Sequence, residues 1–166
     1  MVEGKIRNAD RGSCSLYKTG KSKSIRHYLY PMSAHKIYME QCFALAEKAA
    51  AEGESPVGCV IVKNGVVIGT AYEKSRQLKD ITRHAETLAV LDALQHTTDL
   101  SGSVLYTNVE PCILCSYVIR HYKIGEVVFA SRSGELGGTH KPFNILTTDA
   151  LKSWTEPPKV TVFNEN

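Results

Sequence analysis

An Asn64-Gly65 pair lies between two apolar runs, residues 57–62 and 66–72. A two-residue hairpin turn of type I′ needs positive φ at both central positions, and Asn followed by Gly adopts this conformation most readily. Runs rich in Val and Ile on either side of such a turn are typical of strands. The pair therefore predicts an antiparallel β-hairpin, which any fold of this chain has to contain.

The segments around the hairpin alternate between helix and strand. Apolar residues such as Ile37 and Cys42 recur at helical spacing and predict a helix from Ser33 to the stop at Gly53. After the hairpin we expect a helix from residue 84, with Leu88 and Leu91 on one face. A strand at 104–108 and a helix from Pro111 to Gly125 follow. The rest of the chain is expected to form a strand at 126–130, a loop at 131–144, a short helix at 148–154 and a strand at 160–163. Strands separated by helices are expected to be parallel. The predicted class is α/β, with a mixed five-stranded sheet and helices on both faces.

Composition is ordinary for a globular domain. The 166 residues are 43% hydrophobic and 22% charged, no apolar run is long enough to cross a membrane, and the start lacks a signal-peptide pattern. We therefore expect a cytoplasmic protein without a membrane partner. Residues 1–33 carry seven Lys or Arg and two Asp or Glu and show no helical or strand period, so we expect a flexible basic extension, with an RNA-binding arm as the alternative. Residues 34–166 are expected to form one domain.

Cys112 and Cys115 form a C-x-x-C pair at the start of a predicted helix. Residues three apart on a helix face the same way, so both sulfurs can reach one ion. The positive end of the helix favours thiolates. His84, at the start of the preceding helix, is the candidate third ligand. Three protein ligands and an open position describe a catalytic zinc.

Other uses of a C-x-x-C pair have to be weighed. The pair could be redox-active, or it could be half of a structural zinc site, which needs a fourth protein ligand. No second pair occurs in the sequence. Cys14 falls in the expected extension, whereas Cys42 and Cys59 lie in predicted core positions, where cysteine acts as a small apolar residue.

Glu86 follows His84 by two residues. A carboxylate at this spacing can stand beside a zinc-activated water without binding the metal, take its proton and return it to a leaving amine. Taken alone, Glu86 would be an ordinary solvated helix charge. Its combination with the three candidate ligands favours the role of proton shuttle.

The stretches His84-Ala85-Glu86 and Pro111-Cys112-x-x-Cys115 resemble the H-x-E…P-C-x-x-C signature of the zinc nucleobase deaminases. Over about residues 36–130 the chain is similar to the cytidine and deoxycytidylate deaminase superfamily, and within it to the branch of tRNA adenosine, guanine and cytosine deaminases. The resemblance implies a three-layer α/β/α sandwich and a homodimer. It also implies Zn²⁺ held by His84, Cys112 and Cys115, with Glu86 as the proton shuttle.

Several positions are predicted to contact substrate. Glu73 stands where the branch usually has an Asn, and a carboxylate there would accept hydrogen bonds from a substrate edge made of N–H donors. The alternative is a solvent-facing Glu73 at a strand edge. His140 and Phe143, in a loop unlike that of the tRNA enzymes, could close over a base or serve only to pack the loop. The resemblance is also supported by residues 56–62 and 105–110, and these two stretches contain the remaining candidates for the pocket: Val57, Cys59 and Asn108.

Three functions are compatible with these residues. The leading hypothesis is a deaminase that releases ammonia from a free nucleobase, nucleoside or related aminated heterocycle. The alternative is a tRNA wobble-adenosine deaminase, disfavoured by the net charge of −2 over residues 34–166, by the different loop, and by an end at Asn166 where the branch usually continues into a helix. The third hypothesis, a catalytically silent zinc module that binds RNA or protein, is disfavoured by Glu86.

Overall fold

The predicted hairpin forms one edge of the sheet. The structure is a computed structural model that describes residues 32–164. β1 (Gly58–Lys63) pairs antiparallel with β2 (Val66–Tyr72), and the turn between them has φ of 54° at Asn64 and 81° at Gly65. Both central residues thus have the positive φ that the sequence predicted.

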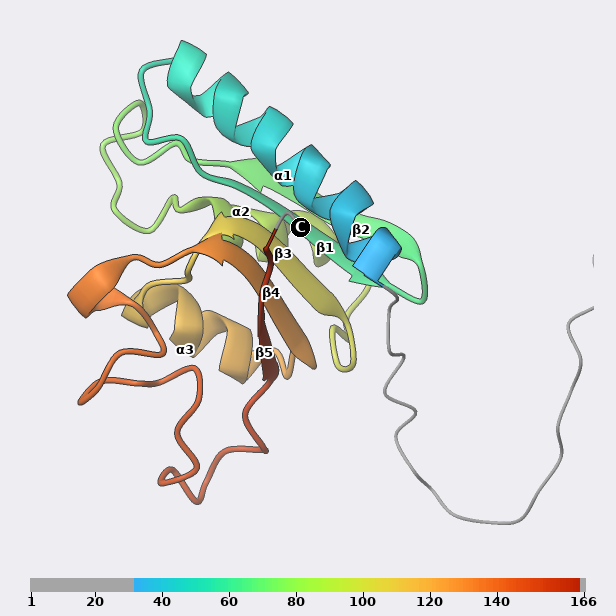
Figure 1. Ribbon diagram of the computed structural model, residues 1–166, viewed down its shortest axis with the longest axis vertical. Coiled ribbons are helices and arrows are strands. Elements are labelled where there is room, and N and C mark those ends of the chain that lie inside the picture. Colours follow the sequence, from blue (N-terminus) through green and yellow to red (C-terminus); the bar gives the residue numbers. More distant parts are fainter. Residues whose placement is uncertain (1–31, 165–166) are drawn as a thin grey trace, which may run out of the picture.

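The sheet has five strands in the order β2-β1-β3-β4-β5 (Figure 1). β3 (Val104–Val109) pairs antiparallel with β1, whereas β4 (Glu126–Ser131) and β5 (Lys159–Val162) continue the sheet in parallel. The predicted mixed five-stranded sheet is therefore confirmed. A short 3₁₀ turn, η1 (Gly134–Leu136), follows β4.

Helices cover both faces of this sheet. α1 (Met32–Ala51) packs on the face formed by Val60 and Val62 of β1, and α2 (Ala85–Ala93) and α3 (Ile113–His121) pack on the face formed by Cys59 and Ile61 (Figure 1). Alternate residues of one strand thus enter two separate cores, as the pleat of a β-strand requires. The expected three-layer α/β/α sandwich is confirmed.

The predicted apolar face of α2 was wrong at Leu91. Leu91 is 42% exposed, and the buried face consists mainly of Ala85, Ala89 and Ala93. The reason lies in β2, where a Cβ added to Gly69 would lie 2.8 Å from the Cβ of Ala93. The helix and the strand approach too closely for leucine side chains between them. In α1, similarly, Ile37 is exposed and Met39 is buried.

The short helix expected at residues 148–154 does not form. The guanidinium of the buried Arg120 donates hydrogen bonds to the carbonyl oxygens of Ile145, Thr148 and Thr155, and it also lies 5.0 Å from the ring of Trp154. These contacts hold residues 148–154 against α3 in an irregular conformation. A long-range side chain therefore decides the conformation against local propensity.

Two further expectations concern the N-terminal segment and the absence of a membrane-spanning helix. The predicted extension of residues 1–33 lies outside the described residues, except that α1 already begins at Met32. Among the helices from residue 32 onward, none is both long and apolar enough to cross a membrane.

Candidate active site

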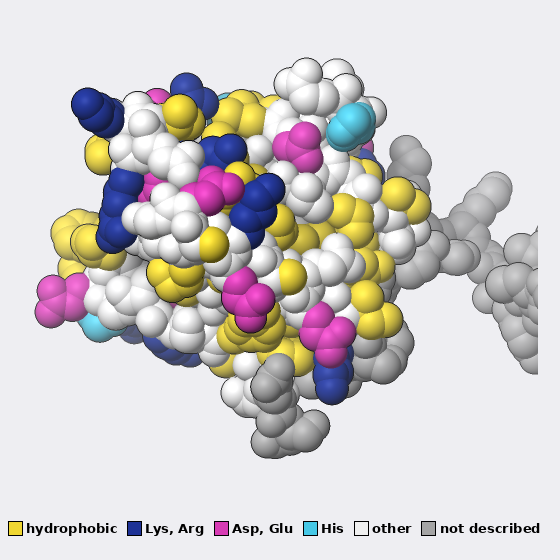
Figure 2. Space-filling view, turned by 90° about the horizontal axis from the view of Figure 1, so that it is seen from above, with side chains coloured by type: hydrophobic (Ala, Val, Ile, Leu, Met, Phe, Trp, Pro, Cys, Tyr) yellow, Lys and Arg dark blue, Asp and Glu magenta, His cyan; other side chains and the backbone are white. Residues whose placement is uncertain are grey.

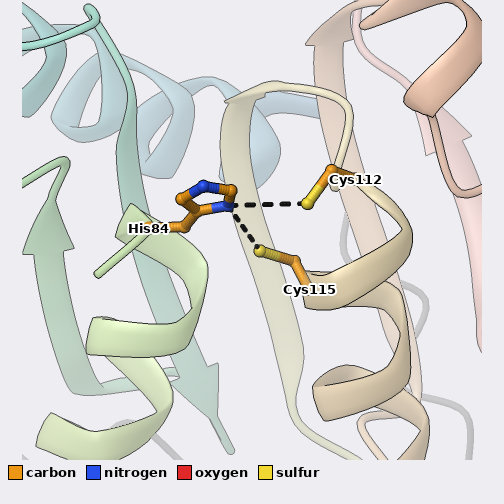
Figure 3. Close-up of side chains that lie close together, drawn as sticks. All are labelled: His84, Cys112 and Cys115. Carbon is orange, nitrogen blue, oxygen red and sulfur yellow. Dashed lines mark hydrogen bonds between the residues drawn. The ribbon is translucent and has the colours of Figure 1, made fainter. Parts of the chain in front are cut away.

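The three predicted ligands meet at one point between α2 and α3. The Nδ1 atom of His84 lies 3.5 Å from the Sγ atom of Cys112 and 3.4 Å from that of Cys115 (Figure 3). All three ligand atoms lie within 4.8 Å of one another. Ligands at about 2.0–2.3 Å from a tetrahedral zinc are separated by roughly 3.3–3.8 Å. The group therefore has the dimensions of a zinc site with three protein ligands.

Helix ends place these ligands. His84 is the N-cap of α2 and Cys112 is the N-cap of α3, both in extended backbone conformation, and Cys115 follows within the first turn of α3. The prediction had the helices start at His84 and Pro111, whereas they begin at Ala85 and Ile113. The positive ends of two helix dipoles converge on the ligand group, which stabilises thiolates there.

The side chains of the group also favour a thiolate. A hydrogen bond from the Cys115 thiol, together with His84, lowers the pKa of Cys112 to about 4. The hydrogen bond to Cys112 raises the pKa of His84 to about 9. The hydrogen bond to Cys112, together with burial, raises the pKa of Cys115. Since zinc binds thiolates and not thiols, Cys112 is prepared for a cation, whereas Cys115 would release its proton on binding one.

Glu86 lies beside the ligands without being one of the three. It is buried in the first turn of α2, and its Oε2 atom accepts a hydrogen bond from the Cys115 thiol at 3.5 Å. Burial raises the pKa of Glu86 to about 7. A carboxyl group with this pKa can both take and give a proton near neutral pH.

A cavity of about 210 Å³ opens onto this group and is lined by His84, Glu86 and Cys112. Of the predicted substrate contacts, Val57 and Glu73 line it as well. Pockets for drug-sized ligands have about 300–1,000 Å³. A cavity of this size has room for a heterocyclic base.

Glu73 has a structural partner that the sequence did not reveal. Its Oε2 atom accepts a hydrogen bond from the backbone N–H of Ala85 at 3.2 Å, and the side chain is buried. The alternative of a solvent-facing Glu73 was therefore wrong. Because His84 provides no side-chain cap, Glu73 satisfies a free N–H group at the start of α2.

The other predicted contacts lie elsewhere. Asn108 links the chain before β1 to β3, since its amide accepts from the N–H of Gly58 and donates to the carbonyl of Pro56, both at 2.8 Å. Cys59 is fully buried in the core under α2 and α3. His140 and Phe143 lie exposed on the loop after β4. None of these four lines the cavity.

Four wall residues were missed by the sequence reasoning: Ser55, Val109, Glu110 and Ser133. Glu110 is the one that carried a signal, because an acidic residue directly follows an apolar strand and directly precedes Pro111. The others come from segments whose proximity to the ligands depends on the tertiary fold.

The loop of residues 73–84, which joins β2 to α2, is rich in basic residues. Beyond the buried Glu73 it contains Lys74, Arg76, Lys79 and Arg83 but only one further acid, Asp80, which pairs with Arg83 at 2.8 Å. Figure 2 shows Lys and Arg side chains, together with acidic ones, gathered at the left end of the face seen from above, and this loop lies at the left in Figure 1. Basic side chains, mixed with acidic ones, therefore lie on the loop that leads to His84.

Comparison with known proteins gives a consistent family. Residues 32–131 match the cytidine and deoxycytidylate deaminase zinc-binding region. The tRNA-specific adenosine deaminase of Aquifex aeolicus (strain VF5) is 42% identical over 108 residues, which are 64% of this chain and 72% of that protein.

Two solved structures show the same architecture. One comes from studies of A-to-I editing by tRNA:A34 deaminases at the wobble position of transfer RNA, and it matches with a TM-score of 0.69 and 26% identity over 76% of this chain and 97% of that chain. The guanine deaminase of Bacillus subtilis matches with a TM-score of 0.56 and 30% identity over 59% of this chain and 64% of that chain.

The family match includes all three residues of the ligand group, His84, Cys112 and Cys115. The zinc-binding family and the His–Cys–Cys geometry together identify Zn²⁺ as the metal that fits the site. The chain therefore belongs to the zinc-dependent cytidine and deoxycytidylate deaminase superfamily, in the branch that resembles the tRNA adenosine deaminases, and is a hydrolase of C–N bonds.

Proposed function

We propose that this enzyme deaminates adenosine to inosine in tRNA, at the wobble position of the anticodon. The observation that carries the proposal is the 42% identity to a tRNA-specific adenosine deaminase over 108 residues. This was the alternative in the sequence analysis, and the comparisons favour it over the leading hypothesis of a free nucleobase or nucleoside. The net charge that had counted against RNA averages over the domain, whereas the loop of residues 73–84, which ends at the ligand His84, has four basic residues against two acidic ones.

His84, Cys112 and Cys115 are proposed to hold the zinc ion, and Glu86 is proposed to move the proton. A zinc ion held by these residues would supply an activated water as the nucleophile for attack on the base. Glu86 takes a proton from the attacking water and returns it to the departing amino group. Its burial beside the ligands and its pKa of about 7 suit both transfers.

The size of the cavity and the basic loop both agree with a base presented by RNA. Enzymes that modify a base in a nucleic acid turn it out of the stack into a close-fitting pocket. A cavity of about 210 Å³ accepts the base and leaves ribose and phosphates at its mouth. Two basic residues of the loop of residues 73–84 are exposed and would attract phosphates: Lys79, and Arg76, whose guanidinium also donates to the carbonyl of Gly53 at 2.9 Å.

A free base is the second candidate substrate, favoured by the 30% identity to a guanine deaminase. A guanine-like edge would offer N–H donors to the carboxylate of Glu73, which lines the cavity. Such an enzyme would need neither the basic loop nor a site open to RNA.

The test is ammonia release from a panel that contains an anticodon stem-loop with a wobble adenosine, the same stem-loop with guanosine at that position, and free adenine, guanine and cytosine. We expect turnover of the adenosine stem-loop alone, with inosine as product. Preferential turnover of a free base would replace the proposal with the second candidate. No turnover of any member by the zinc-loaded protein would favour the silent zinc module.

Glu86→Gln provides the control for chemistry. Gln has nearly the same shape but cannot take the proton, so we expect unchanged zinc content and a loss of kcat of about a hundredfold or more. Thr87→Val, which alters the neighbouring contact to Cys115 at 3.7 Å, is the matched control and should keep most activity. Normal turnover by Glu86→Gln would refute the assigned role.

The homodimer implied by the family resemblance remains a proposal. Leu114 and Tyr117 on the outer side of α3 are exposed, and Trp154 packs beside Tyr117 with ring centroids 5.1 Å apart. An exposed apolar surface of this kind suits a partner subunit. Light scattering of the zinc-loaded protein measures the mass and decides between one chain and two.

A further inference from the structure

Glu110 is a buried acid that the zinc chemistry does not use. Its side chain is only 1% exposed, although it follows the last residue of β3 and directly precedes Pro111. A buried carboxylate is costly unless several donors satisfy it. The donors around Glu110 therefore indicate what this acid does.

Most of these donors belong to the loop that follows β4. The Oε1 atom accepts from the backbone N–H of Thr139 at 3.0 Å and from the hydroxyl of the same residue, and the Oε2 atom accepts from the backbone N–H of Ser133 at 3.3 Å. Arg132 also approaches, at 3.8 Å, but it is 60% exposed, and exposed ion pairs contribute little. One carboxylate thus binds two backbone N–H groups that lie six residues apart.

The loop folds tightly around this carboxylate. A Cβ added to Gly137 would lie 2.7 Å from the Cδ atom of Glu110, so glycine is needed there. Gly137 also forms a β-bridge with the ligand Cys112, and Gly138 donates its N–H to the carbonyl of Pro111 at 2.8 Å. The loop is thereby docked on the start of α3, directly beside the metal ligands.

Both ends of this interaction reach the cavity, because Glu110 and Ser133 line its wall. We propose that Glu110 is a positioning residue, which holds the loop of residues 131–139 in the conformation that completes the substrate cavity. The proposal rests on the proposed deaminase function of this cavity. Glu110 acts through the loop and not on the reacting atoms, so its loss affects substrate binding more than the chemical step.

Glu110→Gln is the decisive variant. An amide has one accepting oxygen and one donating nitrogen, so either the N–H of Ser133 or that of Thr139 would face another donor. Glu126→Gln is the matched control. Glu126 is also buried and accepts from Lys159 at 2.8 Å and from Thr161 at 2.9 Å, but it is the first residue of β4, whereas the loop follows the last.

The first measurement is hydrogen exchange of the Ser133 and Thr139 amides, which requires no substrate. Exchange should be faster in Glu110→Gln by about tenfold or more, the factor expected for one lost hydrogen bond to a charged group. It should stay near the wild-type rate in Glu126→Gln. Unchanged exchange in Glu110→Gln, with the variant folded and its zinc content normal, would overturn the proposal.

The second measurement separates positioning from a general loss of structure. With whichever member of the panel the wild type deaminates, Glu110→Gln should raise KM by about tenfold while kcat stays within roughly threefold, because the loop shapes binding. Thr139→Val, which removes only the hydroxyl donor, should have a smaller effect in the same direction. An unchanged KM would refute the role in the cavity. Failure of the wild type on RNA would refute the proposed function and leave both measurements valid.

Discussion

The hydrogen bond from the N–H of Ala85 to the Oε2 atom of Glu73 supports the start of α2, and with it the placement of His84 and Glu86. Glu73→Ala removes the acceptor and leaves a buried N–H group without a partner. A hydrogen bond to a charged group contributes about 1.5–3 kcal/mol, and we take about 2 kcal/mol for a bond of 3.2 Å. In a domain of this size, that corresponds to a fall in Tm of about 4–8 °C.

Glu73→Gln separates the acceptor from the charge. Its carbonyl oxygen can still accept from Ala85, so we expect a fall in Tm of less than about half that of Glu73→Ala. Calorimetry of the zinc-loaded variants measures both values, and elemental analysis verifies equal zinc content. A Tm for Glu73→Ala within one degree of the wild type, or a larger fall for Glu73→Gln, would refute the capping role.

Glu73→Asn tests whether the same carboxylate also meets the substrate. Asn is shorter and offers a donor as well as an acceptor, so a substrate edge matched to a carboxylate loses a partner. An unpaired buried group costs roughly 1–3 kcal/mol, which changes the kcat/KM ratio between two substrates by about fivefold to more than a hundredfold. Ratios that stay constant across the stem-loops and free bases would remove Glu73 from substrate recognition.

Three further predictions concern the metal and the core. The protein should contain about one zinc per chain, and removal by a chelator should lower Tm and abolish turnover; a metal-free preparation with full activity would contradict this. Burial lowers the pKa of His35, whose Nδ1 lies 3.0 Å from the hydroxyl of Tyr106, with the opposed charges of Glu126 and Lys159 as smaller influences. Because the unfolded chain then binds the proton more readily, stability should fall as the pH drops below about 6.5, and His35→Gln should flatten this dependence in urea unfolding. Gly58→Ala should cost about 1–3 kcal/mol, since the added Cβ would lie 2.5 Å from that of Leu45, and an unchanged urea midpoint would contradict the close packing of α1.

Features set by neighbouring residues could be predicted from the sequence. The Asn64-Gly65 turn depends on the φ preferences of two adjacent residues, and the sulfurs of Cys112 and Cys115 share a side because of helical spacing. His84 was placed because its segment was expected to begin a helix beside that pair. The structure brings these three residues together as that reasoning required.

Features set by distant partners could not be predicted. The alanine face of α2 depends on Gly69 in another element, and the irregular segment after residue 147 depends on Arg120. Asn108 looked like a pocket residue, but its amide is occupied by the backbone on either side of Val57. The residues that line the cavity were harder still to predict, because Glu110 and Ser133 become neighbours only when the loop after β4 folds back on α3.

The ligands come from separate helices, with His84 28 residues before Cys112 and 31 before Cys115. α2 and β3 lie between His84 and Cys112, so an ion bound to all three ligands closes a loop of the chain across the middle of the sheet. Such a closure restricts the unfolded chain much as a disulfide does, and its entropic effect grows slowly with the length of the loop. The metal of this enzyme therefore also serves as a reversible cross-link, which joins the half of the domain containing the hairpin to the half containing the parallel strands.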